Sequence, residues 1–557
     1  MEAESPRKGR RCPGAAPDGP DKLPRLRVCI NLSDCKYAVH GEVCRQLGWE
    51  VFRNDESNLN CDVIWNDAAV NQDILGSLKC HQKLNHFSGI FAVARKNFLA
   101  QHLKKMQRRF PDEYDFFPAT FCLPAERVQL REFAESGRGG PFHIVKPEAS
   151  SQGKGIYLLR RGEEPPGGEP CVVQRYVDRP LLIDGLKFDL RIYVLMTSVT
   201  PLTLYVYEEG LGRFATEPYT APSPKNMGVA CQHLTNYAVN KASPRFSFDQ
   251  QGHAGHKRSL AAVWAALEAQ GVDPRAVTAE IDRMVIKTMC AIQPMLSHVY
   301  CSSQPEDVTG AMCFEILGVD VLIEEGGRPY LLEVNHSPSF NTDTPFDRRV
   351  KSQLLADVFA LLDLSVARRN RIVAHQRQRL QERLTLRQAK LPANPHREEE
   401  RQAYRRELIE LGEAKKTGFR LIYAGEDPSD RYGQFMEYAH LAHLKQTGVL
   451  AKPGAARPAP EPRVATLNSL KENRRRQNVP PSLTHVSGAD FSPKRKAEHA
   501  RTRIQHSLSR LFPREQQPPS RKQPQRSLLP VIKPSIVTFD FQALQAEATF
   551  RKLPSIF

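Results

Sequence analysis

Residues 314–335 form a predicted β-hairpin that carries acidic side chains on one face. Two apolar runs flank the Gly-Gly pair at 326–327, which is typical of a two-residue turn. With that turn, Asp320 falls opposite Glu333 in the neighbouring strand. Asn335 shares the face of Glu333, because side chains alternate along a strand.

The same register makes two further predictions about this hairpin. The pair of residues next to the turn is Glu325 with Arg328. The opposite face of the hairpin is apolar, and we expect it to face a core. Its residues are Val319, Val321, Leu332 and Val334.

The acidic face of the hairpin suits a bound cation. Facing side chains in such a ladder have Cβ atoms roughly 5 Å apart, and two carboxylates at that distance repel each other unless a cation lies between them. Oxygen ligands from Asp, Glu and Asn suit Mg²⁺, which keeps positions open for water and nucleotide phosphates. An ordinary hairpin with a solvated acidic face explains the same residues, so both interpretations stay open at this point.

A small-residue loop between two predicted strands indicates phosphate binding. Strand 143–147 carries Lys146, and loop 150–156 carries Lys154 before strand 157–160. Backbone N–H groups of such a loop can approach phosphate oxygens closely. The loop is not a P-loop, because Gly-Lys-Ser/Thr is absent and a strand follows it. A glycine-rich turn with two solvated lysines is the alternative.

Charged side chains also gather at the start of a long apolar strand. Lys187, Asp189 and Arg191 alternate in sequence, so they share one face of the strand at 188–195. Its expected neighbour is the strand at 202–207. An arginine and a lysine that project together into a cleft would suit phosphate oxygens.

Other elements must position these residues. A strand at 27–33, a helix at 39–49 and a strand at 62–66 predict a small α/β lobe near the N-terminus. A basic amphipathic helix is predicted at 96–110, and a helix at 350–362 closes the globular part.

Composition limits the class of protein. The chain has 557 residues, a formal charge of +17 and a pI near 9.3, so an acidic partner is expected: nucleic acid, an anionic membrane or an acidic protein surface. The 12 cysteines form no Cys-x-x-Cys pair, which disfavours a zinc ribbon or a disulfide framework. Because neither a signal core nor a stretch of about 20 apolar residues is found, we expect a soluble intracellular protein without a membrane partner.

The segment from 366 to 390 has a different character. It contains eight Arg or Lys residues and a single acid, Glu382. Apolar residues recur along it, so it is predicted to be a basic amphipathic helix. It could dock on the core and present its charge to an acidic partner, whereas a solvated basic helix is the alternative.

We therefore predict five regions. They are a disordered start (1–23), an N-terminal α/β lobe (24–130), the central and C-terminal lobes (131–365), a basic helical extension (366–446) and a mostly disordered tail (447–557).

Several of these motifs together resemble the tubulin tyrosine ligase-like family, whose members have an ATP-grasp fold. The matching segments follow the family's order over roughly residues 24–440, at 145–147, 151–156, 184–193, 209–216, 233–237, 314–320 and 331–338. The segment after Val366 also resembles, more loosely, the cationic microtubule-binding region of the autonomous polyglutamylases. The resemblance implies an α/β (α+β) protein with an ATP-grasp ligase core, ATP and Mg²⁺ as cofactors, and free L-glutamate as a substrate.

The family's roles transfer to matching positions in this chain. ATP-binding residues implied in this way are Lys146, Gln152, Gly153, Lys154, Gln174, Arg175, Tyr176, Val177, Lys187, Phe188, Asp189, Thr235 and Asn236. Implied Mg²⁺ ligands are Asp320, Glu333 and Asn335. Implied glutamate-binding residues are Arg213, Tyr237, Lys257 and Asn335, and implied catalytic residues are Arg191, Arg213 and Glu333. Implied microtubule-binding residues are Arg368, Arg369, Arg371, Arg377 and Arg379.

By this resemblance we expect a tubulin polyglutamylase that adds glutamate to γ-carboxylates in acidic tubulin tails through an acylphosphate. A tubulin glycylase, a glutamylase of other proteins and an inactive microtubule-binding protein are the alternatives. The expected setting is the cytoplasm and cytoskeleton, on microtubules, with the cilium or basal body as a narrower expectation. We expect a monomer and no nucleic-acid partner, because no recognition module for nucleic acid is found. The chain departs from the family pattern at Gly212 and at 148–150, which leaves chain initiation versus elongation, and α- versus β-tubulin, open.

Overall fold

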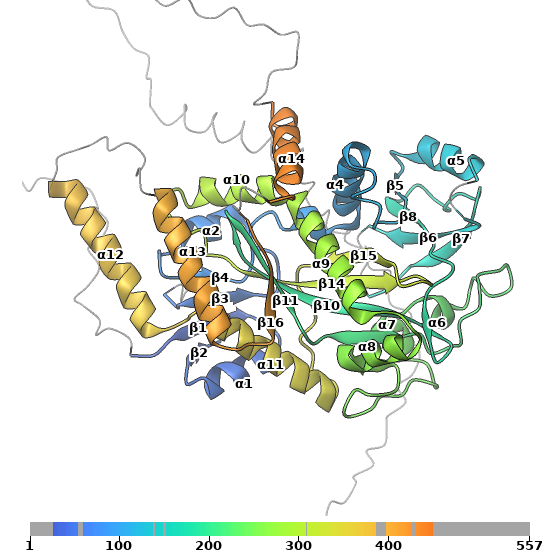
Figure 1. The fold of residues 1–557 in the computed structure, drawn as a ribbon, viewed down its shortest axis with the longest axis horizontal. Coiled ribbons are helices and arrows are strands. Elements are labelled where there is room, and N and C mark those ends of the chain that lie inside the picture. The colour runs from blue at the N-terminus through green and yellow to red at the C-terminus, as the bar shows by residue number, and fades with distance from the viewer. Residues whose placement is uncertain are drawn as a thin grey trace, which may run out of the picture. The chain divides into compact units, whose positions relative to one another are not determined.

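The structure is a computed structural model that describes seven stretches of the chain (Figure 1). These stretches are residues 26–53, 60–137, 140–148, 152–307, 309–385, 397–425 and 430–448. The predicted start at 1–23 and all but the first two residues of the predicted tail at 447–557 lie outside them.

The N-terminal lobe is built on a parallel four-stranded sheet in the order β2-β1-β3-β4. Its elements are β1 (Cys29–Asp34), α1 (Ala38–Gln46), β2 (Glu50–Phe52), β3 (Val63–Asn66), α2 (Gln72–Ser77) and β4 (Lys83–Leu84). Buried apolar strands of this kind need crossover connections, which α1 and α2 help to supply. The predicted strand-helix-strand unit is confirmed.

A second, antiparallel sheet has the order β5-β8-β6-β7. Its strands are β5 (Thr120–Leu123), β6 (Phe142–Pro147), β7 (Tyr157–Arg160) and β8 (Cys171–Arg175), and α5 (Arg127–Glu135) packs beside β5. Helices α3 (Phe91–Ala94) and α4 (Lys96–Arg109) precede this sheet. Strand β5, which precedes the lobe boundary predicted at residue 130, pairs with β8 in this second sheet.

The largest sheet has eight strands and is organised around one long strand, β10. Its members are β9 (Leu182–Ile183), β10 (Leu186–Val199), β11 (Leu202–Tyr207), β12 (Leu211–Phe214), β13 (Lys257–Ser259), β14 (Glu315–Ile323), β15 (Pro329–Asn335) and β16 (Phe419–Ala424). Strand β10 pairs with β9, β11, β12 and β14, all antiparallel. This explains why its sequence is a nearly continuous apolar run with charges only at its start.

Helices line this sheet and complete the main hydrophobic core. Helices α8 (Leu260–Ala269), α9 (Pro274–Cys290) and α10 (Gln293–Ser303) contribute to this core, whereas α11 (Pro345–Leu361) belongs to a second core that it shares with the N-terminal lobe; α6 (Ala230–His233) and α7 (Tyr237–Asn240) are short helices between β12 and β13. Helix α9 begins with Pro274 in its first turn, and the Asp273 carboxylate accepts the Arg275 N–H at 2.9 Å. Helix α11 packs against α1 and so joins the N-terminal lobe to the large sheet.

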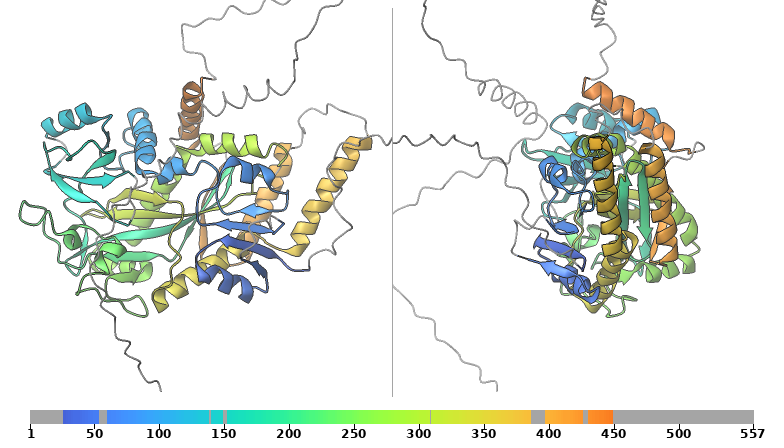
Figure 2. Two further views of the ribbon diagram at one scale, coloured as in Figure 1. Left: turned by 180° about the vertical axis from the view of Figure 1, so that it is seen from behind. Right: turned by 90° about the vertical axis from the view of Figure 1, so that its left-hand side faces the viewer.

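The basic extension is partly built into the core. It consists of α12 (Val366–Thr385), α13 (Arg397–Ala414), β16 and α14 (Gly433–Gln446). Strand β16 adds to the edge of the large sheet at β11, and Phe435 of α14 is buried in the main core. Helix α12 lies at the opposite end of the described fold from the β5–β8 sheet (Figures 1 and 2). Strand β16 and α14, which lie beyond the division predicted at residue 366, are therefore part of the body of the protein.

The overall class is mixed α/β, as predicted. Among the described residues, none of the helices combines the length and apolar character needed to cross a membrane.

Candidate active site

The acidic hairpin forms with the predicted central pair. Asp320 on β14 lies opposite Glu333 on β15, and Val319 lies opposite Val334. The turn itself differs from the prediction, because the Glu324 N–H donates to the Arg328 carbonyl at 2.8 Å, so Arg328 is paired with Glu324 instead of Glu325.

A β-bulge between the turn and the acidic pair restores the register that was predicted for Asp320 and Glu333. Asp320 pairs with Glu333, but the next residue, Val321, pairs with Leu331. Leu332 is therefore an extra residue on β15 without a partner position on β14. Leu332 is half-buried and lines a cleft, whereas the other three apolar residues predicted for the core face are in the core. Leu332 therefore lines the same cleft as Glu333 instead of facing away from it, but it still packs against a small buried cluster that includes Leu322 and Tyr330.

Strand pairing places a row of charged side chains across the large sheet. Arg213 on β12 lies between Lys257 on β13 and Asp189 on β10. Two residues further along β10, Arg191 lies beside Asp320 of β14. The sheet thus brings together residues from five strands that are far apart in the sequence.

Asp320 is bonded to two arginines of this row. Its carboxylate accepts hydrogen bonds from Arg191 Nε at 2.5 Å and from Arg213 Nη2 at 2.7 Å. Arg213 also holds Asp189 through two bonds of 2.7 Å. Burial raises the pKa of Asp320, but the two guanidinium groups outweigh burial and hold this pKa well below its usual range.

Glu333 has the opposite shift. Burial and the nearby Asp320 carboxylate raise the pKa of Glu333, against the lowering effect of Lys96 and Lys146. Asn335 donates weakly to Glu333 Oε1 at 3.4 Å and to the Gly318 carbonyl at 3.2 Å. A divalent cation would relieve the repulsion between the buried Asp320 carboxylate and the half-buried Glu333 carboxylate, so this donor set fits Mg²⁺.

A cleft of about 630 Å³ opens beside these acids. Many of the predicted site residues line it: Lys146, Gln174, Arg175, Tyr176, Val177, Lys187, Asp189, Arg213, Thr235, Asn236, Asp320 and Glu333. Apolar side chains complete its wall: Pro118, Ile144, Ile156, Leu234, Leu322 and Leu332. Apolar walls with a few converging polar groups are typical of a site for a small organic ligand.

Two buried lysines point their charge at this cleft. Lys146 donates to Gln174 Oε1 at 2.8 Å, and Lys187 donates to the Tyr176 hydroxyl at 2.9 Å. Burial lowers the pKa of Lys146 to about 8 and that of Lys187 to about 7, although nearby carboxylates act in the opposite direction. The bonding partners of both ammonium groups are uncharged, so an anionic ligand would stabilise the charged forms of these lysines.

The small-residue loop lies at the edge of the same cleft. Residues 152–154 join β6 to β7 as predicted, and residues 149–151 lie outside the described part of the loop. Gly153 has φ of +81°, and a Cβ at this position would come within 3.0 Å of the Asn236 side chain. Glycine is therefore required here for the loop to approach the cleft wall.

Arg213, Lys257 and Tyr237 form a second group next to the acids. The Lys257 ammonium lies 4.1 Å from the centre of the Tyr237 ring and donates to Asp347 at 2.7 Å. Tyr237 in turn donates to Asp343 at 3.3 Å. Lys257 and Tyr237 do not line the cleft beside Lys146, but the pairing of Arg213 with Lys257 joins the two groups.

One predicted ATP-binding residue lies elsewhere. The Phe188 ring is fully buried and stacks on Phe214 with ring centres 5.3 Å apart, so it packs in the core instead of the cleft.

Sequence reasoning also missed residues that orient the site. Thr120 accepts from Gln174 at 2.9 Å, and His233 bonds the Tyr176 hydroxyl at 3.0 Å. Asp347 is held by Thr344 at the start of α11. A signal existed only for Asp347, because Thr-x-x-Asp before an apolar run indicates a capped helix start.

The five arginines predicted on α12 have different environments. Arg368 is buried, donates to the Leu362 carbonyl at 3.2 Å and lies over the Tyr404 ring. Arg369 forms an ion pair with Asp62 of the N-terminal lobe at 2.8 and 3.0 Å. Both arginines attach α12 to the protein, and their role in microtubule binding stays a prediction.

The remaining arginines of this set are more accessible. Arg371 is exposed and pairs with Glu407 at 3.0 Å, Arg377 is exposed, and Arg379 is half-buried. The accessible charge therefore lies beyond the first turn of α12.

Comparison with known proteins agrees with this geometry. The family model described as "Tubulin-tyrosine ligase family" matches residues 75–372, which contain the large sheet up to β15 and every predicted ATP, metal and glutamate ligand. The chain is 41% identical over 427 residues to a probable beta-tubulin polyglutamylase of Tetrahymena thermophila, covering 76% of this chain and 36% of that protein. It is 37% identical over 434 residues to a tubulin polyglutamylase of Danio rerio, covering 77% and 54%. It is 38% identical over 415 residues to a tubulin polyglutamylase of Homo sapiens, covering 74% and 45%.

The chain thus spans between about a third and just over half of the length of these curated relatives. The family match itself covers more than half of this chain and includes both the cleft and the acidic hairpin. The protein belongs to the tubulin-tyrosine ligase family.

Proposed function

We propose that this protein is an ATP-dependent ligase that joins glutamate to γ-carboxylates of glutamates in tubulin C-terminal tails. The observation that carries this proposal is the row of charged side chains across the large sheet. In this row Lys257 and Arg213 lie side by side on β13 and β12, and Asp320 and Glu333 lie side by side on β14 and β15. Two buried lysines, Lys146 and Lys187, line the cleft beside the row.

The cleft suits ATP. Its apolar wall would hold the adenine ring, and Lys146 and Lys187 would bind phosphate oxygens. Tyr176 and Gln174 fix the ammonium groups of these lysines in place. Such preorganised cations stabilise a transferring phosphoryl group without reorganising during the reaction.

Asp320, Glu333 and Asn335 would hold Mg²⁺. When bound, the ion would neutralise charge on the transferring phosphate and help to orient it. Arg191 is positioned beside Asp320 at 2.5 Å and would supply positive charge at the same place. A cation between the carboxylates would also compete with Arg213 for Asp320.

The incoming amino acid would bind at Arg213 and Lys257. Two cations side by side match an amino acid that has two carboxylates, because each carboxylate can then be paired. Asp347 and Asp343 hold Lys257 and Tyr237 in place. Glycine has no side-chain carboxylate to use this site, which favours glutamate over glycine.

The reaction joins two partners that both carry carboxylates, so one carboxylate must be activated. An oxygen of the acceptor carboxylate attacks the γ-phosphorus of ATP, and ADP leaves with the electrons of the broken P–O bond. The amine of free glutamate then attacks the acyl carbon, an amide forms and phosphate leaves. The amine loses a proton in this step, and Arg191 and Arg213, which both bind Asp320, would stabilise the negative charge that develops.

The tubulin tail is acidic, which gives the accessible arginines of α12 a role. Arg371, Arg377 and Arg379 would act together as a weak, salt-sensitive field that holds the enzyme on the microtubule. We propose a monomer that works on cytoskeletal microtubules and has neither a membrane nor a nucleic-acid partner. Relatives over this length are named tubulin polyglutamylases, which supports the choice of acceptor.

The test is incorporation of labelled amino acid into purified microtubules with ATP and Mg²⁺. We expect incorporation of glutamate and none of glycine. Incorporation of glycine without glutamate would replace the proposal with a glycylase. Binding to microtubules with no incorporation of either amino acid would mean that the protein is not an active ligase.

A further inference from the structure

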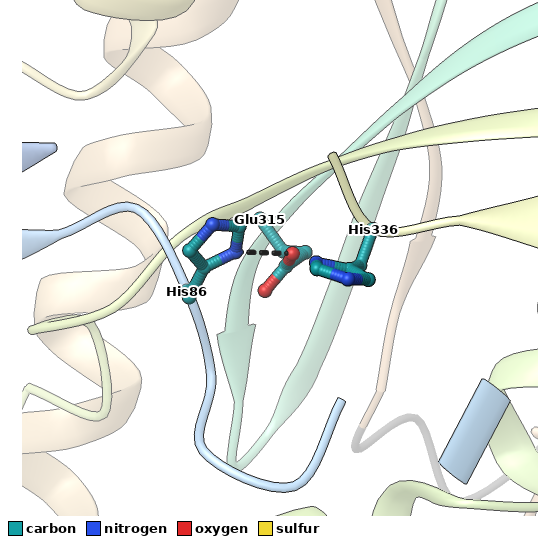
Figure 3. A group of neighbouring side chains, drawn as sticks. All are labelled: His86, Glu315 and His336. Carbon is teal, nitrogen blue, oxygen red and sulfur yellow. Dashed lines mark hydrogen bonds and ion pairs between the residues drawn. The ribbon is translucent and has the colours of Figure 1, made fainter. Parts of the chain in front are cut away.

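A second group of potential metal ligands lies outside the ATP cleft. Three side chains from separate segments meet beside the start of β14 and the end of β15 (Figure 3). They are His86, Glu315 and His336. One ligand atom from each lies within 4.8 Å of the other two. His86 and Glu315 are buried and His336 is half-buried, so the group is enclosed but reachable from one side.

Two of the three side chains are already oriented by the backbone. His86 Nε2 donates to the Asn66 carbonyl at 2.9 Å, which leaves Nδ1 facing Glu315 Oε1 at 2.7 Å. The Phe87 N–H donates to the other oxygen of Glu315 at 2.9 Å. Metal-bound histidines and carboxylates are usually held by this kind of outer hydrogen bond.

The third side chain is held by ring contacts and by a hydrogen bond of 3.2 Å between His336 Nδ1 and the Ser337 hydroxyl, which leaves Nε2 for a metal. The His336 ring meets the His86 ring edge-on with centres 5.5 Å apart, and it meets the Phe91 ring at 5.2 Å. His86 and His336 also line a small hollow, whose wall combines the polar side chains of Asn66, Asp67 and Asn85 with apolar ones such as Trp65 and Phe340. This hollow leaves room for a water molecule as a fourth ligand.

We propose that His86, Glu315 and His336 bind a divalent transition-metal ion of the zinc type. Two imidazoles and one carboxylate are a known ligand set for Zn²⁺, whereas Mg²⁺ prefers oxygen ligands and would favour the Asp320–Glu333 pair. The metal replaces the proton shared by His86 Nδ1 and Glu315 Oε1, which passes to solvent. Zinc–ligand bonds of about 2.0–2.2 Å place neighbouring ligand atoms about 3.4 Å apart, so the 2.7 Å pair must widen by less than about 1 Å.

Such an ion would fasten three parts of the protein together. His86 belongs to the loop after β4, Glu315 begins β14, and His336 follows β15. The ion would therefore tie the N-terminal lobe to both strands of the catalytic hairpin. This role is independent of which amino acid the enzyme transfers.

The test uses the full-length protein freed of metal with a chelator. Zinc is then titrated against a chromophoric chelator, and Co²⁺ is added to a second sample for its visible spectrum. We expect about one tight zinc per chain and the intense visible bands of low-coordinate cobalt. Added zinc should also raise Tm, because it binds the folded chain.

Two variants decide where the metal binds. His336→Gln should weaken zinc binding about tenfold or more and remove the cobalt bands. His298→Gln is the matched control, because His298 is an exposed histidine on α10 outside the group. Its ring centre lies 5.7 Å from that of His443. It should bind zinc as the unaltered protein does.

Three results would overturn the proposal. They are the absence of zinc binding at micromolar concentrations, unchanged binding in His336→Gln, and loss of binding only in His298→Gln. X-ray absorption of the unaltered zinc-loaded protein provides a reading that does not depend on the folding of a variant. A first shell without histidine nitrogens would also contradict the assignment.

Discussion

Asp320 and Glu333 face each other across β14 and β15, and their pKa values are shifted in opposite directions. Arg191 and Arg213 keep Asp320 ionised, whereas the pKa of Glu333 is raised by burial and by Asp320 itself. The positive charge that Asp320 receives from the two arginines is thus not shared equally by Glu333, and a cation between the two carboxylates would offset the shift of Glu333. This relationship is what makes the hairpin a metal site in our proposal, instead of a solvated turn.

Glu333→Gln removes one charge from this pair without changing its size. We expect glutamate incorporation to fall about 100-fold or more, because a contact to the developing charge is worth about 3 kcal/mol. Microtubule co-sedimentation should stay unchanged, since β15, the strand that carries Glu333, lies away from α12 (Figure 1). Glu325→Gln on the exposed turn of the same hairpin is the control and should leave incorporation intact. Ligation retained by Glu333→Gln would refute the metal role of Glu333.

Nucleotide affinity should depend on pH through Lys187. Its pKa of about 7 means that the lysine is charged below pH 7 and becomes neutral above it. The charged form binds phosphate, so affinity should fall as pH rises from 7 to 9, by up to about tenfold per pH unit. A fluorescent ATP analogue titrated at several pH values measures this. Lys187→Gln should bind more weakly at pH 7 and with a flatter pH dependence, and an unaltered slope in this variant would exclude Lys187 as the cause.

Gly212 is required by packing next to Arg213. A Cβ at this position would lie 2.6 Å from Val263 Cγ2 on α8, which is shorter than side chains tolerate. We expect Gly212→Ala to lower the free energy of unfolding by about 1–3 kcal/mol and to raise the KM for glutamate more than that for ATP. Urea unfolding and steady-state kinetics measure these two effects.

The control for Gly212→Ala is Gly433→Ala. Gly433 begins α14, and a Cβ added there would meet open space, so alanine at this position should leave stability nearly unchanged. Equal stability of the two variants would show that β12 and α8 are not as closely packed as described.

The arginines of α12 should separate into two groups by experiment. Arg369→Gln breaks the pair with Asp62 and should lower the free energy of unfolding by about 1–3 kcal/mol. The double variant Arg371→Gln, Arg377→Gln should leave stability nearly unchanged but weaken microtubule co-sedimentation, most strongly at low salt. Weaker co-sedimentation at all salt concentrations in Arg369→Gln, with no effect of the double variant, would reverse this assignment.

Part of the site could be predicted because its signals are local. The alternation of Lys187, Asp189 and Arg191 gives their shared face directly, and the Gly-Gly pair locates the hairpin that contains Asp320 and Glu333. The predicted turn was nevertheless wrong by one residue. A glycine pair fixes where a chain reverses but not how many residues the turn uses, and the bulge at Leu332 happened to restore the central pair.

Other features depend on contacts between distant segments, which leave no local pattern. The pairing of β16 with β11 and the ion pair between Asp62 and Arg369 are of this kind. For Arg369 the sequence indicates a basic helix, and only the packed structure tells which face of that helix meets the N-terminal lobe. Phe188 was assigned to ATP for its position in a motif, whereas alternation along β10 turns its ring to the core beside Phe214.

In the proposed reaction, this cleft activates an acceptor carboxylate with ATP and joins it to glutamate. An acidic tubulin-tail peptide whose side-chain carboxylates carry ¹⁸O, with ATP, Mg²⁺ and unlabelled glutamate, tests this step at the reacting atoms. We predict that each ligated glutamate releases one ADP and one inorganic phosphate that contains a single ¹⁸O from the acceptor. Ligation that releases unlabelled phosphate, or that releases AMP, would contradict the proposed reaction.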